Sequence, residues 1–139
     1  MSESHTKILT RNDTGETGSH QGGIAVPKTH RELINFFPRL DVKQFNPESW
    51  IYCTDQDGER WKLRYIYYNG KSFTPSKSTR NEYRITQMTR LFGKWNAKGG
   101  DSIVFTSTTK KNEYKVEIKK LKDNETSTVI VLKGWSHIF

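Results

Sequence analysis

A short polar stretch in the middle of the chain carries side chains of the kinds that read nucleic-acid bases. It runs from Lys77 to Arg84 and holds Arg80, Asn81 and Glu82 in succession. An arginine can donate two hydrogen bonds to guanine, an asparagine can pair with adenine, and a glutamate can accept from cytosine. The stretch therefore predicts base reading. A salt bridge that orients a neighbouring arginine is a second role for Glu82, compatible with the first, and a solvated basic loop is the alternative for the whole stretch.

Positive charge is concentrated around this stretch. The chain has 139 residues, with 23 Lys and Arg against 15 Asp and Glu, a formal net charge of +8 and a pI of about 9.6. Between Arg60 and Lys98 ten basic residues stand against one acid, Glu82, so this segment carries +9 and the rest of the chain −1. A localised basic region is the electrostatic footprint that phosphate binding requires. The composition therefore indicates an anionic partner.

Catalytic motifs are weak by comparison. Glu117-Ile-Lys119 matches part of a metal-dependent nuclease motif, and Asp101 lies upstream. The same spacing is expected on any solvated strand of a lysine-rich protein, so we interpret it as a solvated face. The four histidines have no metal-ligand spacing, and the chain contains neither a G-x-S-x-G elbow nor a phosphate-binding loop. We therefore expect no catalytic site, no metal and no cofactor in this domain, with a compact nuclease as the alternative.

A second alternative is a single-stranded nucleic-acid binder. Its stacking platforms would be exposed aromatic side chains, namely Tyr67, Tyr68, Phe73 and Tyr83. The single cysteine, Cys53, excludes an internal disulfide, and its apolar neighbours predict a half-buried thiol. Because the sequence has no signal peptide and no membrane-length apolar run, we expect no membrane partner and a cytoplasmic location.

The elements that position these residues are predicted to be mainly β. The alternation of Trp61, Leu63, Tyr65 and Tyr67 puts these side chains on one face of a strand. About seven short strands and one or two short helices predict one domain, residues 1–139, folded as an open β-barrel. The predicted strands are 7–10, 24–27, 50–54, 61–68, the beginning of 84–92, 102–105, 114–121 and 129–132. The predicted helices are 31–37 and the end of 84–92, and 11–23 and 69–76 are predicted as polar loops.

Several strings resemble the N-terminal domain of EcoRII-type restriction endonucleases. These are the segments at 12–18 (Asn-Asp-Thr-Gly-Glu-Thr-Gly), 20–21, 66–69 and 79–86 (Thr-Arg-Asn-Glu-Tyr-Arg-Ile-Thr). The resemblance extends over about residues 7–86. Further on, 100–105 and 114–118 look like the end of the plant B-three transcription-factor domain, which shares a DNA-binding pseudobarrel with the EcoRII-type module.

The resemblance implies a seven-stranded pseudobarrel that grips the major groove of duplex DNA between two arms, with CCWGG as the family target. It also implies a prokaryotic protein and an effector role beside a separate nuclease domain, which would use Mg²⁺. The present 139 residues leave no room for that nuclease, so the chain is either an excised N-terminal part or works alone. The implied contacts of the first arm are Lys7, Arg11, Asn12, Asp13, Thr14, His20 and Gln21. Those of the second arm and its neighbouring strand are Arg64, Lys71, Lys77, Arg80, Asn81, Glu82 and Arg84.

The sequence departs from the family pattern at three places. Phe73 to Ser76 lengthen the second arm, Tyr83 replaces a basic residue, and Ala25 replaces a tyrosine. These changes bear on individual contacts and on the target sequence.

Overall fold

Eight strands form a single curled sheet in the computed structural model, which describes residues 2–18, 22–77, 80–121 and 134–138. The sheet order is β2-β5-β4-β3-β7-β6-β1-β8, and all neighbours are antiparallel except β3 and β7. The strands are β1 (Ser4–Ile8), β2 (Ile24–Val26), β3 (Glu48–Thr54), β4 (Arg60–Tyr68), β5 (Glu82–Thr86), β6 (Ser102–Ser107), β7 (Glu113–Lys119) and β8 (Trp135–Ile138). The helices are α1 (Arg31–Phe36), α2 (Gly70–Phe73) and α3 (Thr89–Lys94).

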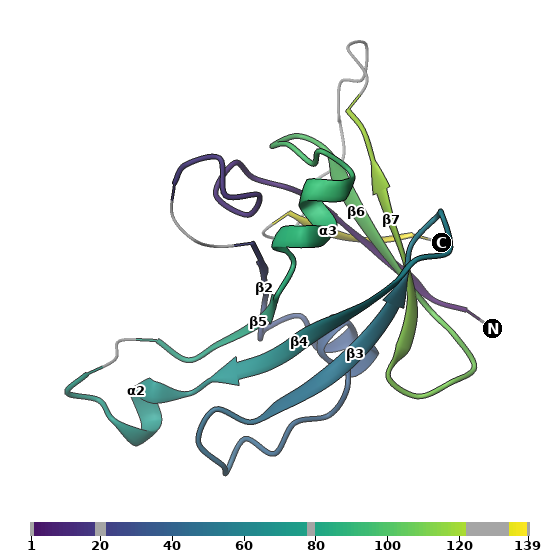
Figure 1. The fold of residues 1–139 in the computed structure, drawn as a ribbon. Coiled ribbons are helices and arrows are strands. Elements are labelled where there is room, and N and C mark those ends of the chain that lie inside the picture. Colours follow the sequence, from purple (N-terminus) through teal and green to yellow (C-terminus); the bar gives the residue numbers. More distant parts are fainter. Residues whose placement is uncertain (1, 19–21, 78–79, 122–133, 139) are drawn as a thin grey trace.

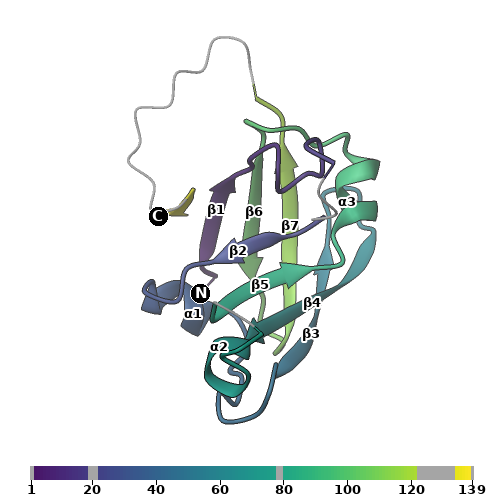
Figure 2. The ribbon, with the colours of Figure 1, turned by 90° about the vertical axis from the view of Figure 1, so that its left-hand side faces the viewer.

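The sheet curls into an open barrel whose two edge strands, β2 and β8, come together. The indole Nε1 of Trp135 on β8 donates to the backbone oxygen of Ala25 on β2 at 2.9 Å. This single side-chain bond joins edges that no strand pairing connects among the described residues. Helices α1 and α3 lie at opposite ends of the barrel (Figure 2). The expected mainly β open barrel is therefore confirmed.

The core follows from the alternation of side chains along each strand. Leu63 and Tyr65, which the sequence placed on one face of β4, are fully buried. The positions predicted to point inward on β7, Tyr114, Val116 and Ile118, are also buried. Aromatic rings fill the barrel next to α1. The ring centroid of Phe37 lies 5.1 Å from that of Tyr65 and 5.5 Å from that of Phe105.

Three predictions need correction. The loop 69–76 contains the helix α2, which brings the helices to three. It is a single turn, made by bonds such as Thr74 N to Gly70 O at 2.6 Å, and is too short to show a helical period. Strand β8 was not expected, and the predicted strand at 129–132 lies outside the described residues. Cys53 is completely buried rather than half-buried, and this desolvation raises the pKa of its thiol.

No helix in the described ranges is long and apolar enough to cross a membrane.

Candidate nucleic-acid interface

A polar groove of about 670 Å³ lies between two projections of the chain. One projection, the N-arm, is the loop 9–18 that follows β1. The other, the C-arm, is the segment 69–81 that joins β4 to β5 and includes α2. Both arms extend from the same side of the barrel (Figure 1). The residues that line the groove are Asn12, Gly22, Arg64, Tyr68, Arg80, Glu82, Arg84, Thr86, Gln87 and Thr89.

Strand register explains why the charged side chains meet on the groove floor. In the antiparallel β4–β5 pair, Arg64 lies opposite Thr86, and Tyr68 lies opposite Glu82. Directly opposite residues point to the same face of a sheet, and every second residue along a strand returns to that face. Arg84, two residues from Glu82, therefore joins them. The other face of the same two strands carries the core residues Leu63, Tyr65 and Ile85, while Ile66, opposite Arg84, is buried on the groove face.

Ion pairs hold two of the groove arginines in place. Arg84 Nη1 donates to Glu82 Oε1 at 3.1 Å, and Arg64 Nε donates to Glu48 Oε2 on β3. The side chains of Arg84 and Glu82 are only 18% and 27% exposed. Partial burial restricts their rotamers, and a guanidinium oriented in advance loses less entropy when it binds a base or a phosphate. The groove therefore presents oriented donors beside a carboxylate acceptor.

The N-arm is built around a buried ion pair. Lys7 Nζ lies 2.6 Å from Asp13 Oδ2, and these side chains are 5% and 11% exposed. The same carboxylate oxygen accepts from the backbone nitrogen of Thr10 at 2.9 Å. At its base, the arm is fastened to the turn before β6 by the bonds Leu9 N to Asp101 O and Gly100 N to Leu9 O, both 2.8 Å. The structure thus buries Lys7 of β1 against Asp13 of the arm, and this pair helps to shape the arm.

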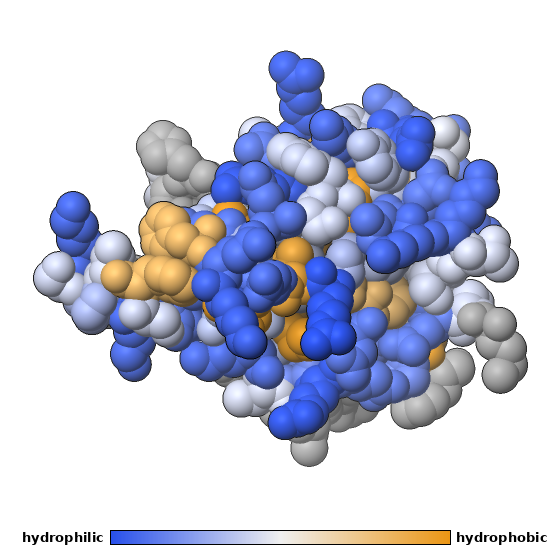
Figure 3. All heavy atoms as spheres, turned by 90° about the horizontal axis from the view of Figure 1, so that it is seen from below, coloured by the Kyte–Doolittle hydropathy of each residue, from blue (hydrophilic) through white to orange (hydrophobic). Residues whose placement is uncertain are grey.

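The C-arm is held at its base by a buried asparagine. Asn69 is 1% exposed. Its side-chain oxygen accepts from Asn46 N at 2.8 Å, and its side-chain nitrogen donates to Gln44 O at 2.6 Å. These bonds attach the loop 41–46 to the arm. Phe45 from this loop packs on Phe73 of α2 with ring centroids 5.7 Å apart, and both rings remain about half exposed. Figure 3 shows apolar side chains gathered next to the projecting arm on an otherwise largely hydrophilic underside.

Asn81 ties α2 to the strand that follows it. Its Nδ2 donates to Ser72 Oγ at 2.9 Å, and its Oδ1 accepts from Ser72 N at 3.3 Å. A third bond, from Lys71 N to Arg80 O at 3.3 Å, joins the same two segments. The side chains of Lys71, Lys77 and Arg80 are exposed along this arm.

The structure brings together part of the predicted site. Asn12, Arg64, Arg80, Glu82 and Arg84 line the groove. Arg11 and Thr14 belong to the N-arm, where Arg11 is 74% exposed on its side chain and lies 3.3 Å from Glu16, while the Thr14 hydroxyl donates to Arg11 O. His20 and Gln21 lie outside the described residues. Base or phosphate contacts by any of the predicted residues stay predictions.

Five groove residues are absent from the predicted DNA contacts, namely Gly22, Tyr68, Thr86, Gln87 and Thr89, although Tyr68 was named for the single-strand alternative. Thr86 continues the two-residue period of Glu82 and Arg84, so strand alternation alone could have identified it. Gln87 has a φ of 67° at the junction of β5 and α3, a conformation that is uncommon for residues with a Cβ and frequent at functional sites. Thr89 starts α3. Neither the backbone conformation of Gln87 nor the approach of α3 to the groove has a sequence signal.

The nuclease alternative finds no support in the geometry. Asp101 is buried, and its carboxylate binds Lys120 Nζ at 2.6 Å and Leu121 N at 2.8 Å. Glu117 is exposed on β7 and lies opposite Val104. Because Ser102 pairs with Lys119, Asp101 and Glu117 are separated by about three residues along the strands, roughly 10 Å.

Two of the four aromatic residues considered as stacking platforms, Tyr67 and Tyr83, pack on each other instead. Tyr67 and Tyr83 stack on each other with centroids 4.2 Å apart, and Tyr83 also stacks on the buried Tyr65 at 5.8 Å. Desolvation raises the pKa of Tyr83. Tyr83, which stands where the family has a basic residue, therefore packs on the core side of the sheet.

Residues 2–130 match the family model described as "Restriction endonuclease EcoRII, N-terminal". A curated relative, the type II restriction enzyme EcoRII of Escherichia coli, is 36% identical over 86 residues. That alignment covers 60% of this chain and 20% of the relative, so the chain matches about a fifth of the relative's length.

Among solved structures, the chain is similar in fold to the Arabidopsis FUS3–DNA complex. The TM-score is 0.62 with 20% sequence identity, over 84% of this chain and 96% of the other.

Proposed function

The chain belongs to the restriction endonuclease EcoRII N-terminal family, and from this premise we propose that it is an effector domain that binds double-stranded DNA sequence-specifically. The target we propose is CCWGG, gripped in the major groove by the N-arm and the C-arm. The domain would act in the cytoplasm of a prokaryotic cell beside a nuclease domain of a longer protein.

The observation that carries this proposal is the convergence of Arg64, Arg80, Glu82 and Arg84 in one polar groove between two arms. The major groove of B-DNA is about 12 Å wide and accepts a pair of β-strands. Affinity would come largely from phosphate contacts of the exposed basic residues Lys71 and Lys77, because counterion release dominates binding to duplex DNA. Specificity would come from the oriented arginines and the carboxylate on the groove floor.

Fluorescence anisotropy with a CCWGG duplex and a scrambled duplex, at about 0.15 M salt, tests the proposal. We expect the wild-type chain to prefer the CCWGG duplex. Arg80→Ala should lose about 1–3 kcal/mol of that preference and relax one position of the target.

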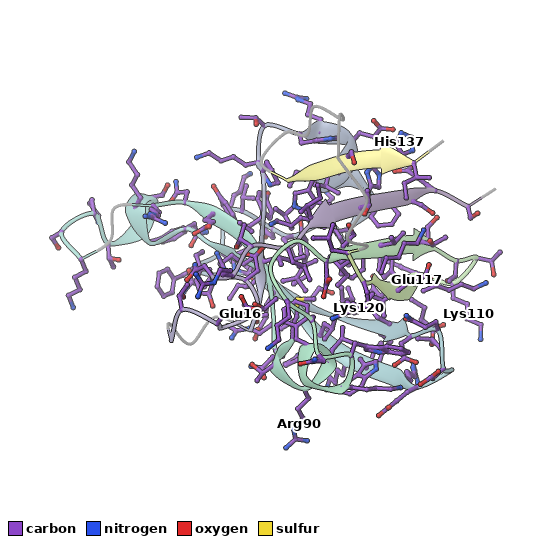
Figure 4. All side chains as sticks on the ribbon, turned by 90° about the horizontal axis from the view of Figure 1, so that it is seen from above. Glu16, Arg90, Lys110, Glu117, Lys120 and His137 are labelled. Carbon is purple, nitrogen blue, oxygen red and sulfur yellow. The ribbon has the colours of Figure 1, made fainter. Side chains whose placement is uncertain are left out.

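The matched control is Arg90→Ala, which removes the same charge from the same basic segment. Arg90 is exposed on α3 and its side chain points away from the body of the molecule (Figure 4). We expect it to leave the ratio of the two affinities unchanged. Equal binding of the wild type to both duplexes would contradict the proposed target, and an equal loss on both duplexes in Arg80→Ala would contradict its role as a base reader.

A further inference from the structure

Three side chains of types that can ligate transition metals meet at the end of the molecule away from the arms. One potential ligand atom from each of Glu3, His5 and His137 lies within 4.8 Å of the other two. His5 on β1 and His137 on β8 are direct cross-strand partners, and their rings stack with centroids 4.8 Å apart. Glu3 Oε2 lies 2.5 Å from His5 Nε2. The two ends of the described chain lie opposite the arms, and His137 points from β8 on that side (Figures 1 and 4).

His5 has an open nitrogen that ordinary packing does not explain. Its residue exposure is 0%, yet its Nδ1 has no hydrogen-bond partner among the described residues. Buried polar atoms are nearly always paired, because an unpaired one loses its water without compensation. The ring of Phe36 covers His5 at a centroid distance of 4.7 Å. The other ring nitrogen, Nε2, contacts the Glu3 carboxylate, and the ring stacks on that of His137, so groups that can donate to a metal surround this buried imidazole.

The surrounding charge also suits a dication. Glu32 Oε1 lies 3.4 Å from His137 Nδ1, so two carboxylates, those of Glu3 and Glu32, border the paired histidines. His30 is the other titratable neighbour, with its ring centroid 6.2 Å from that of His5. Its Nδ1 accepts from Leu33 N as the cap of α1.

We propose that Glu3, His5 and His137 bind one Zn²⁺ ion, with the fourth position open to Glu32 or water. Two histidines and one glutamate are a ligand set that zinc uses in proteins, with bonds of about 2.0–2.2 Å. Ligand atoms of a tetrahedral site lie about 3.4 Å apart, so the three groups, now within 4.8 Å of one another, need to draw together by up to roughly 1.4 Å. The stacked rings of His5 and His137 also need to rotate, because the lone pair of an imidazole nitrogen lies in the plane of its ring. The bound ion would cross-link β8 to β1 at the closure of the barrel.

Thermal unfolding of metal-free protein, followed by circular dichroism during titration with Zn²⁺ or Mg²⁺, tests this proposal. The wild-type melting temperature should rise with Zn²⁺ concentration, because a ligand of the native state stabilises it by mass action. Mg²⁺ should give no shift, since imidazole favours zinc over magnesium. Co²⁺ added in place of Zn²⁺ should give a visible absorption band.

Two substitutions identify the ligands. His137→Gln and Glu3→Gln should abolish the Zn²⁺-dependent shift, and both side chains are partly exposed, at 22% and 38%. Glu113→Gln is the matched control, because this glutamate pairs with Arg60 on the surface, and it should keep the full shift. Melting without metal establishes that each variant folds.

The proposal is overturned if His137→Gln keeps the wild-type Zn²⁺ shift, or if Mg²⁺ produces the same shift as Zn²⁺. No Zn²⁺ shift in the wild type would overturn it as well. DNA affinity should not depend on Zn²⁺, because the groove is on the other side of the molecule, so these outcomes are independent of the proposed function.

Discussion

Arg84 and Glu82 point to the same face of β5, and Arg84 Nη1 donates to Glu82 Oε1 at 3.1 Å. The sequence left two roles open for Glu82, base reading and orientation of a neighbouring arginine, and this contact supplies the second. The first stays a prediction. The carboxylate has two oxygens and is 27% exposed on the groove floor, so the contact leaves it able to accept from a base.

Glu82→Ala should lower the preference for the CCWGG duplex by about 1–3 kcal/mol, because it removes an acceptor and releases the Arg84 guanidinium. Binding to the scrambled duplex should stay the same or become tighter, since a negative charge near the phosphates is lost. Anisotropy titrations with both duplexes measure the two effects separately. A uniform weakening on both duplexes would be inconsistent with a role for Glu82 in specificity.

Gly22 is packed so closely on α3 that a side chain does not fit. A Cβ at this position would lie 1.9 Å from Thr89 Oγ1 and 2.9 Å from Thr89 N, and the Gly22 oxygen accepts from Met88 N at 2.8 Å. Gly22→Ala should therefore cost about 1–3 kcal/mol of unfolding free energy and weaken DNA binding, because the wall of the groove has to move. Urea unfolding and anisotropy measure the two quantities.

The control for Gly22→Ala is Gly93→Ala, on the helix α3 against which Gly22 packs. A Cβ at Gly93 meets no atom within 4 Å, so this variant should be as stable as the wild type or more stable by up to about 1 kcal/mol. If both variants lose the same stability and affinity, close packing at Gly22 is not the cause.

The buried pair of Lys7 and Asp13 should contribute to stability as well as to the shape of the N-arm. Asp13→Ala leaves the Lys7 ammonium buried without its partner, and breaking such a pair costs about 3–5 kcal/mol. By contrast, Glu113→Ala breaks the exposed contact with Arg60, 57% exposed on its side chain, and should cost at most about 1 kcal/mol. Urea unfolding of both variants makes the comparison, and similar losses would contradict a buried, uncompensated lysine.

Asp55 should make stability depend on pH in the acid range. Burial opposes ionisation of this carboxyl, but hydrogen bonds from Lys94, Trp61, Glu59 N and Trp95 outweigh it and hold its pKa below the usual range. A carboxyl with a lower pKa in the folded state stabilises fully above its unfolded pKa of about 3.9, and this contribution is lost as the pH falls below it. Unfolding free energy measured by urea titration should therefore decrease below about pH 4.

Asp55→Asn should be less stable than the wild type at neutral pH and should show a shallower decrease in acid. Asp57→Asn is the control, because Asp57 also lies near Lys94, at 3.4 Å, but is 62% exposed on its side chain. It should keep the wild-type pH dependence. An equally steep decrease in Asp55→Asn would assign the acid sensitivity to other carboxylates.

Much of the sheet could be predicted from the sequence because it depends on local alternation. The hairpin of β3 and β4 and the inward residues of β7 follow from side chains that alternate every second residue. The strings that resemble the EcoRII family lie in the segment where the groove residues were found. Element α2 could not be predicted in this way, because it is a single turn. Strand β8 depends on pairing with β1 at the other end of the chain, and such distant pairing leaves no local pattern.

In the basic segment from Arg60 to Lys98, counting charges does not separate the cations that stabilise the fold from those that line the groove. Lys94 lies within 4 Å of Asp55, Asp57 and Glu59, and Arg60 contacts Glu113, so these two cations serve the fold. Arg64, Arg80 and Arg84 line the groove. All of these residues are equivalent in a count of charges, and only their partners in space distinguish them.

By itself, the sequence determined the mainly β class, the basic region and the family to which its motifs belong, because these depend on residue type and short spacing. The tertiary structure decided that Lys7 of β1 forms a buried pair with Asp13 of the N-arm, that Asn81 contacts α2, and that His5 meets His137. Those outcomes depend on contacts between strands and loops distant in sequence, and such contacts are set by the pairing order of the whole sheet.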